Sequence, residues 1–170
     1  MSGTGFLLKI QTMKILKYIT LSLASLIITS CSTDEGPTKD EEKPSITINY
    51  SGGFPQACES LKRGKTYTFK ARVSDNESLA SYSLDLHHNF DHHTHDDQGA
   101  TCTMNPKKEA TNPLIYMRNF SLDGAKKEYE IAIEVSIPED IDPGDYHCSY
   151  SVTDETGWQS RTSIDIKIIE

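Results

Sequence analysis

Ser81-Tyr82-Ser83-Leu84-Asp85-Leu86-His87-His88-Asn89-Phe90 alternates apolar and polar side chains. Side chains of a strand point alternately to the two faces of a sheet, so Tyr82, Leu84 and Leu86 are predicted to face a core. His87 then points to the opposite face. Similar runs, each bounded by Gly, Pro, Asn or Asp, recur at 45–50, 66–73, 114–122, 128–137, 145–153 and 163–169. About seven short strands without a helical stripe predict an all-β fold, an antiparallel β-sandwich.

The first thirty residues are predicted to be a secretory signal that does not belong to the fold. Lys14 and Lys17 precede an apolar run at 18–28, and small residues lead into Cys31. The run is shorter than the about 20 apolar residues that a membrane span needs, which disfavours a transmembrane anchor. Met13 is the expected natural start.

The end of this signal resembles the lipobox of bacterial lipoproteins. The resemblance implies that Cys31 becomes the lipidated N-terminus. Ser-Thr-Asp-Glu at 32–35 looks like the acidic signal that sends Bacteroidota lipoproteins to the outer face of the outer membrane. A periplasm-facing lipoprotein is the alternative. Residues 31–44 are expected to be a disordered tether, because they are polar and rich in Pro, and 45–170 to form the single folded domain.

The chain is acidic, with a formal net charge of −8. The signal contributes Lys9, Lys14 and Lys17 and no acid, so the mature chain carries −8 − 3 = −11. This charge disfavours nucleic acid and anionic lipid as partners. We also expect a monomer, whose contact with the membrane is the N-terminal lipid on Cys31.

Asp142-Pro143-Gly144-Asp145-Tyr146-His147-Cys148 resembles the turn into the sixth strand of immunoglobulin-like domains, where a Tyr two residues before a Cys closes the tyrosine corner. The partner Cys of antibody domains is missing from 66–74, so their inter-sheet disulfide is not expected. The segments 73–79, 87–97 and 144–157 also resemble an uncharacterised family of Bacteroidota lipoproteins, domain-of-unknown-function family 4625. That resemblance covers most of 45–170 and implies an immunoglobulin-like module without an established activity.

Five of the six histidines lie between His87 and Asp97. The third and sixth strands of an immunoglobulin-like sandwich are antiparallel neighbours, so His87 is predicted to lie beside His147 on the outer face. The rest of the His-rich run can then fold back over this pair. The candidate metal ligands are His87, His93, His95 and His147, with Asp91 as a ligand or a partner of a ligand. Imidazole with carboxylate suits zinc first, and copper or nickel after it.

Three cysteines follow Cys31, and all are predicted at the end of the sandwich that carries the histidines. Cys58 and Cys102 lie in connections, which favours a disulfide between them, although the sequence allows three pairings. Cys148 falls on the inward side of its strand and is expected to be a buried thiol. A cysteine ligand to the metal is less expected in an oxidising envelope.

The leading hypothesis is a non-enzymatic, lipid-anchored immunoglobulin-like module that binds a transition-metal ion. The alternative is a cell-surface adhesion module that recognises protein or glycan without metal. A metal-dependent hydrolase is a third and less favoured hypothesis. It needs an open coordination position and a general base, which His87, His93 and His147 with Asp91 could supply, but the sequence shows no recognisable cleft. His88 is expected to be a semi-buried structural residue. The acidic turns at 75–77 and 154–155 are expected to cap loops, with calcium binding as the less favoured reading.

Overall fold

The computed structural model describes residues 39–95 and 102–170. The predicted signal, Cys31 and most of the tether lie outside this part of the chain, as do Asp96 and Asp97. The described residues form an all-β domain, and they contain no helix long and apolar enough to cross a membrane.

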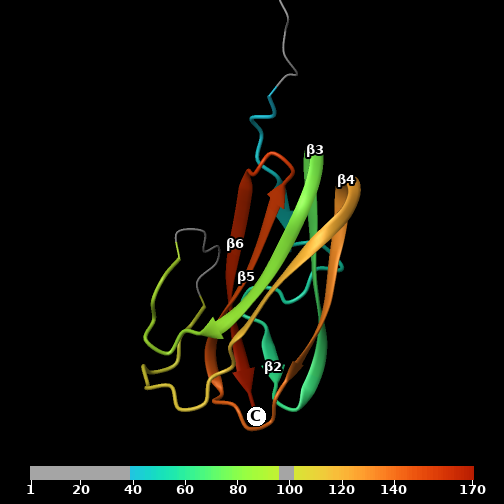
Figure 1. Cartoon of the computed structure of the whole chain (residues 1–170). Coiled ribbons are helices and arrows are strands. Elements are labelled where there is room, and N and C mark those ends of the chain that lie inside the picture. The colour runs from blue at the N-terminus through green and yellow to red at the C-terminus, as the bar shows by residue number, and fades with distance from the viewer. Residues whose placement is uncertain (1–38, 96–101) are drawn as a thin grey trace, which may run out of the picture. The chain divides into compact units, whose positions relative to one another are not determined.

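Six strands make up the described domain. They are β1 (Ser45–Thr47), β2 (Ser60–Lys62), β3 (Lys65–His88), β4 (Tyr116–Ile137), β5 (Gly144–Asp154) and β6 (Gln159–Ile169). The strand order is β1-β3-β5-β6-β2, and β4 pairs with β3. All pairs are antiparallel except β2 with β6, which is parallel. Because β3 and β4 are long and bend together, the sheet curls into two facing layers (Figure 1).

The long strands β3 and β4 each combine two runs that the sequence predicts as separate strands. The β3–β4 register passes from Ser74↔Glu128 to Leu79↔Lys126 across an irregularity. There, Asp75 Oδ2 accepts hydrogen bonds from the N–H groups of Glu77 and Ser78, at 2.9 and 2.8 Å. The polar stretch that looks like a turn is therefore a bulge at which one strand bends from one layer into the other. The short strand β2 was not predicted, because three residues carry no alternation to detect.

The core lies between the two layers. The inward positions predicted from alternation are buried on both central strands: Tyr82, Leu84 and Leu86 on β3, and Tyr146, Cys148, Tyr150 and Val152 on β5. Phe69 and Ile131 face them from the other layer and are also buried. Each fully buried side chain of this kind stabilises the fold by about 1.5–3 kcal/mol.

The tyrosine corner is present at the start of β5. Tyr146 Oη donates a hydrogen bond to the carbonyl oxygen of Asp142 at 2.6 Å, and it accepts one from the N–H of Leu114 at 3.2 Å. Gly144 adopts a φ of 144°, and a Cβ there would lie 2.8 Å from the ring of Phe90. This turn therefore needs glycine, and it sets where β5 begins.

The Tyr146→Phe variant is expected to lose about 1–2 kcal/mol of unfolding free energy, because it leaves a part-buried carbonyl and a buried N–H without their partner. Urea denaturation measures the change. Tyr116→Phe, at a partly exposed tyrosine, is the control and should change stability by less than about 0.5 kcal/mol. Equal stability of the two variants would show that the corner does not stabilise the fold.

Candidate metal centre

The end of β3 and the start of β5 bring two histidines together. His87 and His147 are direct register partners across this antiparallel pair, as alternation and strand order predict. Their ring centroids are 5.4 Å apart. Both rings lie on the outer face of the sheet, opposite the core.

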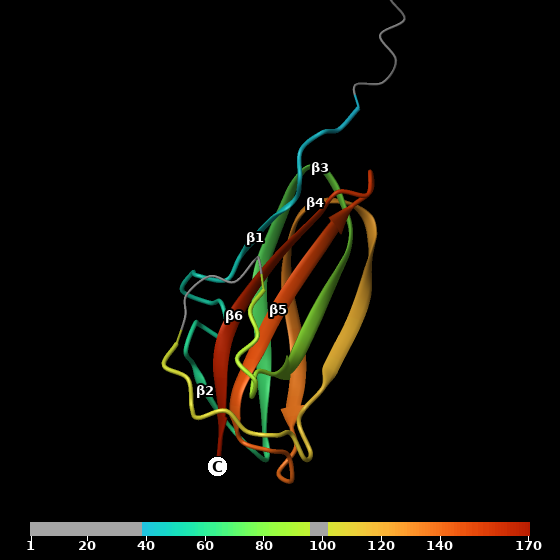
Figure 2. The ribbon, with the colours of Figure 1, turned by 90° about the vertical axis from the view of Figure 1, so that its left-hand side faces the viewer.

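The segment after β3 folds back over this pair. His92 has a left-handed backbone (φ 61°), and its N–H donates to the carbonyl of Asn89 at 3.3 Å, which reverses the chain. The segment after β3 projects from the sheet in Figure 1 and passes in front of β5 in Figure 2. His147 Nε2 lies 3.2 Å from the carbonyl oxygen of His93, and this cover leaves His147 with 0% exposure. An outward-facing residue is thereby buried by its own neighbouring loop.

Four histidines converge in this place: His87, His93, His95 and His147. Each offers one ring nitrogen, and these atoms all lie within 4.8 Å of one another. His87 Nε2 is 3.2 Å from His93 Nε2 and 3.1 Å from His95 Nε2. Tetrahedral zinc with bonds to nitrogen of about 2.0–2.1 Å separates its ligand nitrogens by about 3.3–3.4 Å. Both distances from His87 Nε2 are thus close to the ligand separation of a tetrahedral metal site.

Carboxylates stand behind three of the four rings. Asp85 Oδ1 lies 3.1 Å from His87 Nδ1, Asp91 Oδ1 lies 2.7 Å from His93 Nδ1, and Asp165 Oδ1 lies 2.8 Å from His147 Nδ1. At His87 and His93 the carboxylate beside Nδ1 holds the ring proton there, so the lone pair is left on Nε2. Lone pairs that face each other at such short distances repel, and a cation between them removes the repulsion. This pattern is typical of histidines that bind a metal.

Two pKa shifts favour the metal-binding protonation state. Burial lowers the pKa of His147 below its ordinary value, so this ring is neutral near pH 7. The hydrogen bond with the His93 ring lowers the pKa of Asp91 to about 2, so this side chain remains a carboxylate. Neutral imidazole is the form that coordinates metals.

The predicted metal residues divide into two groups. The four histidines come together, whereas Asp91 is not one of the converging groups and contacts His93 from outside. Asp85 and Asp165 were not among the predicted residues. Asp85 shares the outward parity of His87, and Asp165 is the register partner of His147 on β6, so strand parity and pairing were the signals for both.

The remaining histidines and cysteines lie outside this group. His92 Nε2 contacts the Asn105 carbonyl oxygen at 2.8 Å, and the His88 ring packs on Phe90 with centroids 4.9 Å apart. Cys148 is a buried thiol, and burial raises its pKa. The structure therefore gives the metal-binding set no sulfur ligand among the described residues.

Cys58 and Cys102 form a disulfide with a Cα–Cα distance of 5.5 Å, which is the pairing favoured from the sequence. The Cys58 N–H donates to the backbone carbonyl of Asp165 at 2.8 Å. The disulfide thus connects the chain that returns from the His-rich loop to the strand that carries the carboxylate behind His147.

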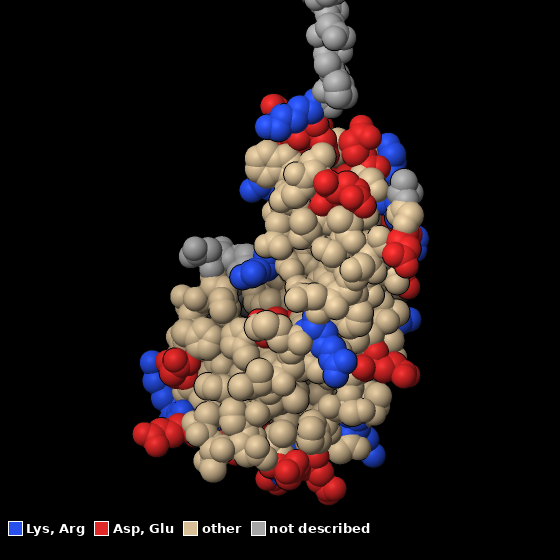
Figure 3. Space-filling model, in the orientation of Figure 1, with Lys and Arg blue, Asp and Glu red and all other residues tan. Residues whose placement is uncertain are grey.

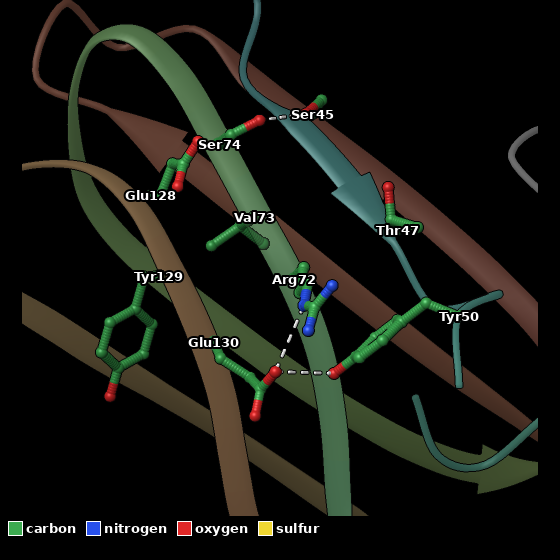
Figure 4. A pocket seen from close by; sticks show the side chains of 9 residues that line it. All are labelled: Ser45, Thr47, Tyr50, Arg72, Val73, Ser74, Glu128, Tyr129 and Glu130. Carbon is green, nitrogen blue, oxygen red and sulfur yellow. Dashed lines mark hydrogen bonds and ion pairs between the residues drawn. The ribbon is translucent and has the colours of Figure 1, made fainter. Parts of the chain in front are cut away.

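A hollow elsewhere on the domain lacks these properties. It has a volume of about 630 Å³ and is lined by residues of β1, β3 and β4, together with Tyr50 (Figure 4). Its polar groups already pair with one another. Arg72 Nε and Tyr50 Oη both lie 3.3 Å from Glu130 Oε2, and the guanidinium of Arg72 lies over the Tyr50 ring. None of the four converging histidines lines it, so the histidine group is the stronger candidate site.

Comparisons with known proteins give a family and a set of distant structural likenesses. Solved structures that resemble the chain include a DUF4466 family protein from Parabacteroides merdae (14% identity, TM-score 0.47, 74% of this chain and 44% of that one). A second is the sporulation control protein Spo0M of Bacillus subtilis (9% identity, TM-score 0.42, 75% of this chain and 49% of that one). A third is the GspB Siglec domain (15% identity, TM-score 0.41, 76% of this chain and 59% of that one). The chain thus spans less than two thirds of each of these proteins.

No curated protein matches the chain. Residues 29–169 match the family described as "Domain of unknown function (DUF4625)", and the match extends over nearly all of the described domain. The chain therefore belongs to the DUF4625 family.

Proposed function

We propose that this protein is a lipid-anchored module of the cell envelope that binds one transition-metal ion, zinc first, through His87, His93, His95 and His147. The observation that carries the proposal is the close approach of His87 Nε2 to the Nε2 atoms of His93 and His95, at 3.2 and 3.1 Å. The carboxylates behind the rings support it. The lipid anchor and the outer-membrane location rest on the sequence pattern around Cys31.

The number of ligands favours metal binding over catalysis. Catalytic zinc is held by three protein ligands and keeps a fourth position for water or substrate, whereas four protein ligands close a tetrahedral shell. His147 is fully buried beneath the loop, which also restricts access. The function that fits this geometry is metal capture, or stiffening of the 89–95 loop by the ion.

Elemental analysis of the purified protein and titration with zinc, copper and nickel test the proposal. We expect one zinc ion per chain and tighter binding of zinc than of nickel. The His93→Ala/His95→Ala variant should no longer bind zinc, because it lacks two of the four ligands. The His92→Asn variant is the matched control: it removes a neighbouring imidazole outside the group, and Asn tolerates the left-handed backbone.

The titration has a clear opposing outcome. If the wild-type protein holds no metal at micromolar concentration, the proposal fails. The alternative function is then an adhesion module that recognises protein or glycan through the same end of the domain without metal.

The Asp91→Asn variant is expected to weaken zinc binding by about 10–100-fold, because His93 loses the carboxylate that orients its ring. Asp91 is 70% exposed, so its replacement should leave the fold intact. Competition with a chromophoric zinc chelator measures the change in affinity. Asp123→Asn, at an exposed acid on β4, removes the same charge away from the histidines and should bind zinc like the wild type. Equal affinities for both variants would assign Asp91 no part in the site.

A further inference from the structure

A second group of side chains that could bind a metal lies at the opposite end of the β3–β5 ladder. It consists of Asp40 before β1, Asp75 in the β3 bulge and Asp154 at the end of β5, with one carboxylate oxygen from each within 4.8 Å of the others. Leu79↔Asp154 is the last register pair at this end of the β3–β5 ladder, and the His87↔His147 pair lies near its other end. At about 3.3 Å per strand residue the two positions are about 26 Å apart, so the two groups are separate.

The three carboxylates share one pattern of hydrogen bonds. In each, one oxygen accepts two hydrogen bonds. Asp40 accepts from the Glu42 N–H and from Asn76 Nδ2, and Asp75 accepts from the N–H groups of Glu77 and Ser78. Asp154 accepts from Thr156 Oγ1 and from the Trp158 N–H. The other oxygen of each is buried and has no hydrogen-bond donor among the described residues: Asp40 Oδ2, Asp75 Oδ1 and Asp154 Oδ2. The donors therefore orient the carboxylates, and one oxygen of each is left for another partner.

The cost of this arrangement points to a cation. Asp154 is only 2% exposed, and burying a carboxylate oxygen without a donor or a counter-charge is strongly unfavourable. No ion pair between described residues includes these three carboxylates. Lys127 is nearby but contacts the carbonyl oxygen of Asn76. Acidic and basic side chains both lie on the surface at this end of the domain (Figure 3).

We propose that Asp40, Asp75 and Asp154 form a calcium-binding site. The group offers only oxygen ligands, which suit hard cations, whereas the histidine group offers only nitrogen. Ser78, whose N–H donates to Asp75 Oδ2, also has a buried Oγ without a hydrogen-bond partner among the described residues. Calcium completes its six to eight ligands with backbone oxygens or water.

Calcium would then fasten the chain that enters the domain. Asp40 precedes β1, in the segment predicted to be a tether, and Asp75 and Asp154 belong to the two central strands. Trp158 already connects these parts, because its Nε1 donates to the Asp40 carbonyl at 3.1 Å and its N–H to Asp154 Oδ1 at 2.8 Å. A bound ion would make this connection depend on calcium.

The position of Trp158 provides the test, because it is the only tryptophan of the chain. Terbium binds calcium sites and emits when a nearby tryptophan is excited. We expect sensitised emission from the full-length protein that saturates at one terbium per chain and is displaced by calcium. In calorimetry, calcium should raise the melting temperature more than the same concentration of magnesium.

The Asp75→Asn variant separates binding from folding. It keeps the oxygen that accepts from Glu77 and Ser78 but removes a charge, so its melting temperature without calcium should equal or exceed that of the wild type. It should lose both the sensitised terbium emission and the calcium-dependent rise in melting temperature. The His93→Ala/His95→Ala variant is the matched control and should keep both signals, which distinguishes this site from the histidine site.

Two results would overturn the proposal. One is a wild-type melting temperature that calcium leaves unchanged. The other is a calcium-dependent rise that persists in Asp75→Asn. Failure of zinc binding at the histidines would leave the calcium proposal intact, because the calcium test follows a different ion at different residues.

Discussion

Zinc is expected to stabilise the wild-type protein by about 4 kcal/mol when free zinc is about 1,000 times the dissociation constant, and this stabilisation should disappear in His147→Gln. His147 is fully buried, and Asp165 lies 2.8 Å from its Nδ1. It is therefore the most rigidly held member of the group and the one that connects the loop to the sheet. Urea denaturation with and without zinc measures the effect.

The comparison is made within each variant, because replacing a buried histidine also changes the stability of the metal-free protein. His92→Asn should keep the full zinc effect, since His92 lies outside the group. A His147→Gln protein that zinc still stabilises as strongly as the wild type would remove His147 from the site.

Loss of the disulfide is the second large effect. The Cys58→Ser/Cys102→Ser variant is expected to lose about 4 kcal/mol of unfolding free energy, because the bridge closes a loop with a sequence separation of 44 residues and so restricts the unfolded chain. Zinc affinity should also fall. The disulfide holds the chain that follows the His-rich loop beside Asp165. Without the disulfide, part of the free energy of zinc binding is used to order His93 and His95.

Urea denaturation under oxidising and reducing conditions measures this loss. Reductant should bring the wild-type protein to the stability of the double variant and should leave the variant unchanged, since Cys148 is buried and unpaired. If reductant does not affect the wild type, the bridge contributes nothing to stability.

Strand parity was sufficient for much of the fold and part of the site. Alternation in 81–90 and 145–153 predicted the inward side chains, which are buried, and the tyrosine-corner pattern identified how β5 begins. Alternation did not predict that the outward positions Asp145, His147, Ser149 and Ser151 are buried as well. Because side chains of neighbouring strands pair by register, the same alternation predicted that His87 and His147 meet. The His-rich run was visible as composition, and its proximity to the end of the third strand followed from chain connectivity.

Other features depend on contacts between distant segments, which local patterns do not encode. The Asp75–Ser78 stretch has the composition of a turn, yet it forms a bulge, because pairing with β4 continues on both sides of it. Asp40 lies in a polar segment with no strand pattern, and only packing brings it to Asp75 and Asp154.

The sequence by itself determined the all-β architecture, the inward and outward faces of the central strands, and the histidines that supply the candidate site. These depend on side-chain period and composition, which are local. The tertiary structure alone decided that His147 is buried, that Asp91 stands behind His93, and that three distant aspartates converge. The reason is that burial and convergence are set by which segments cover one another, and that depends on the free energy of the whole packed domain.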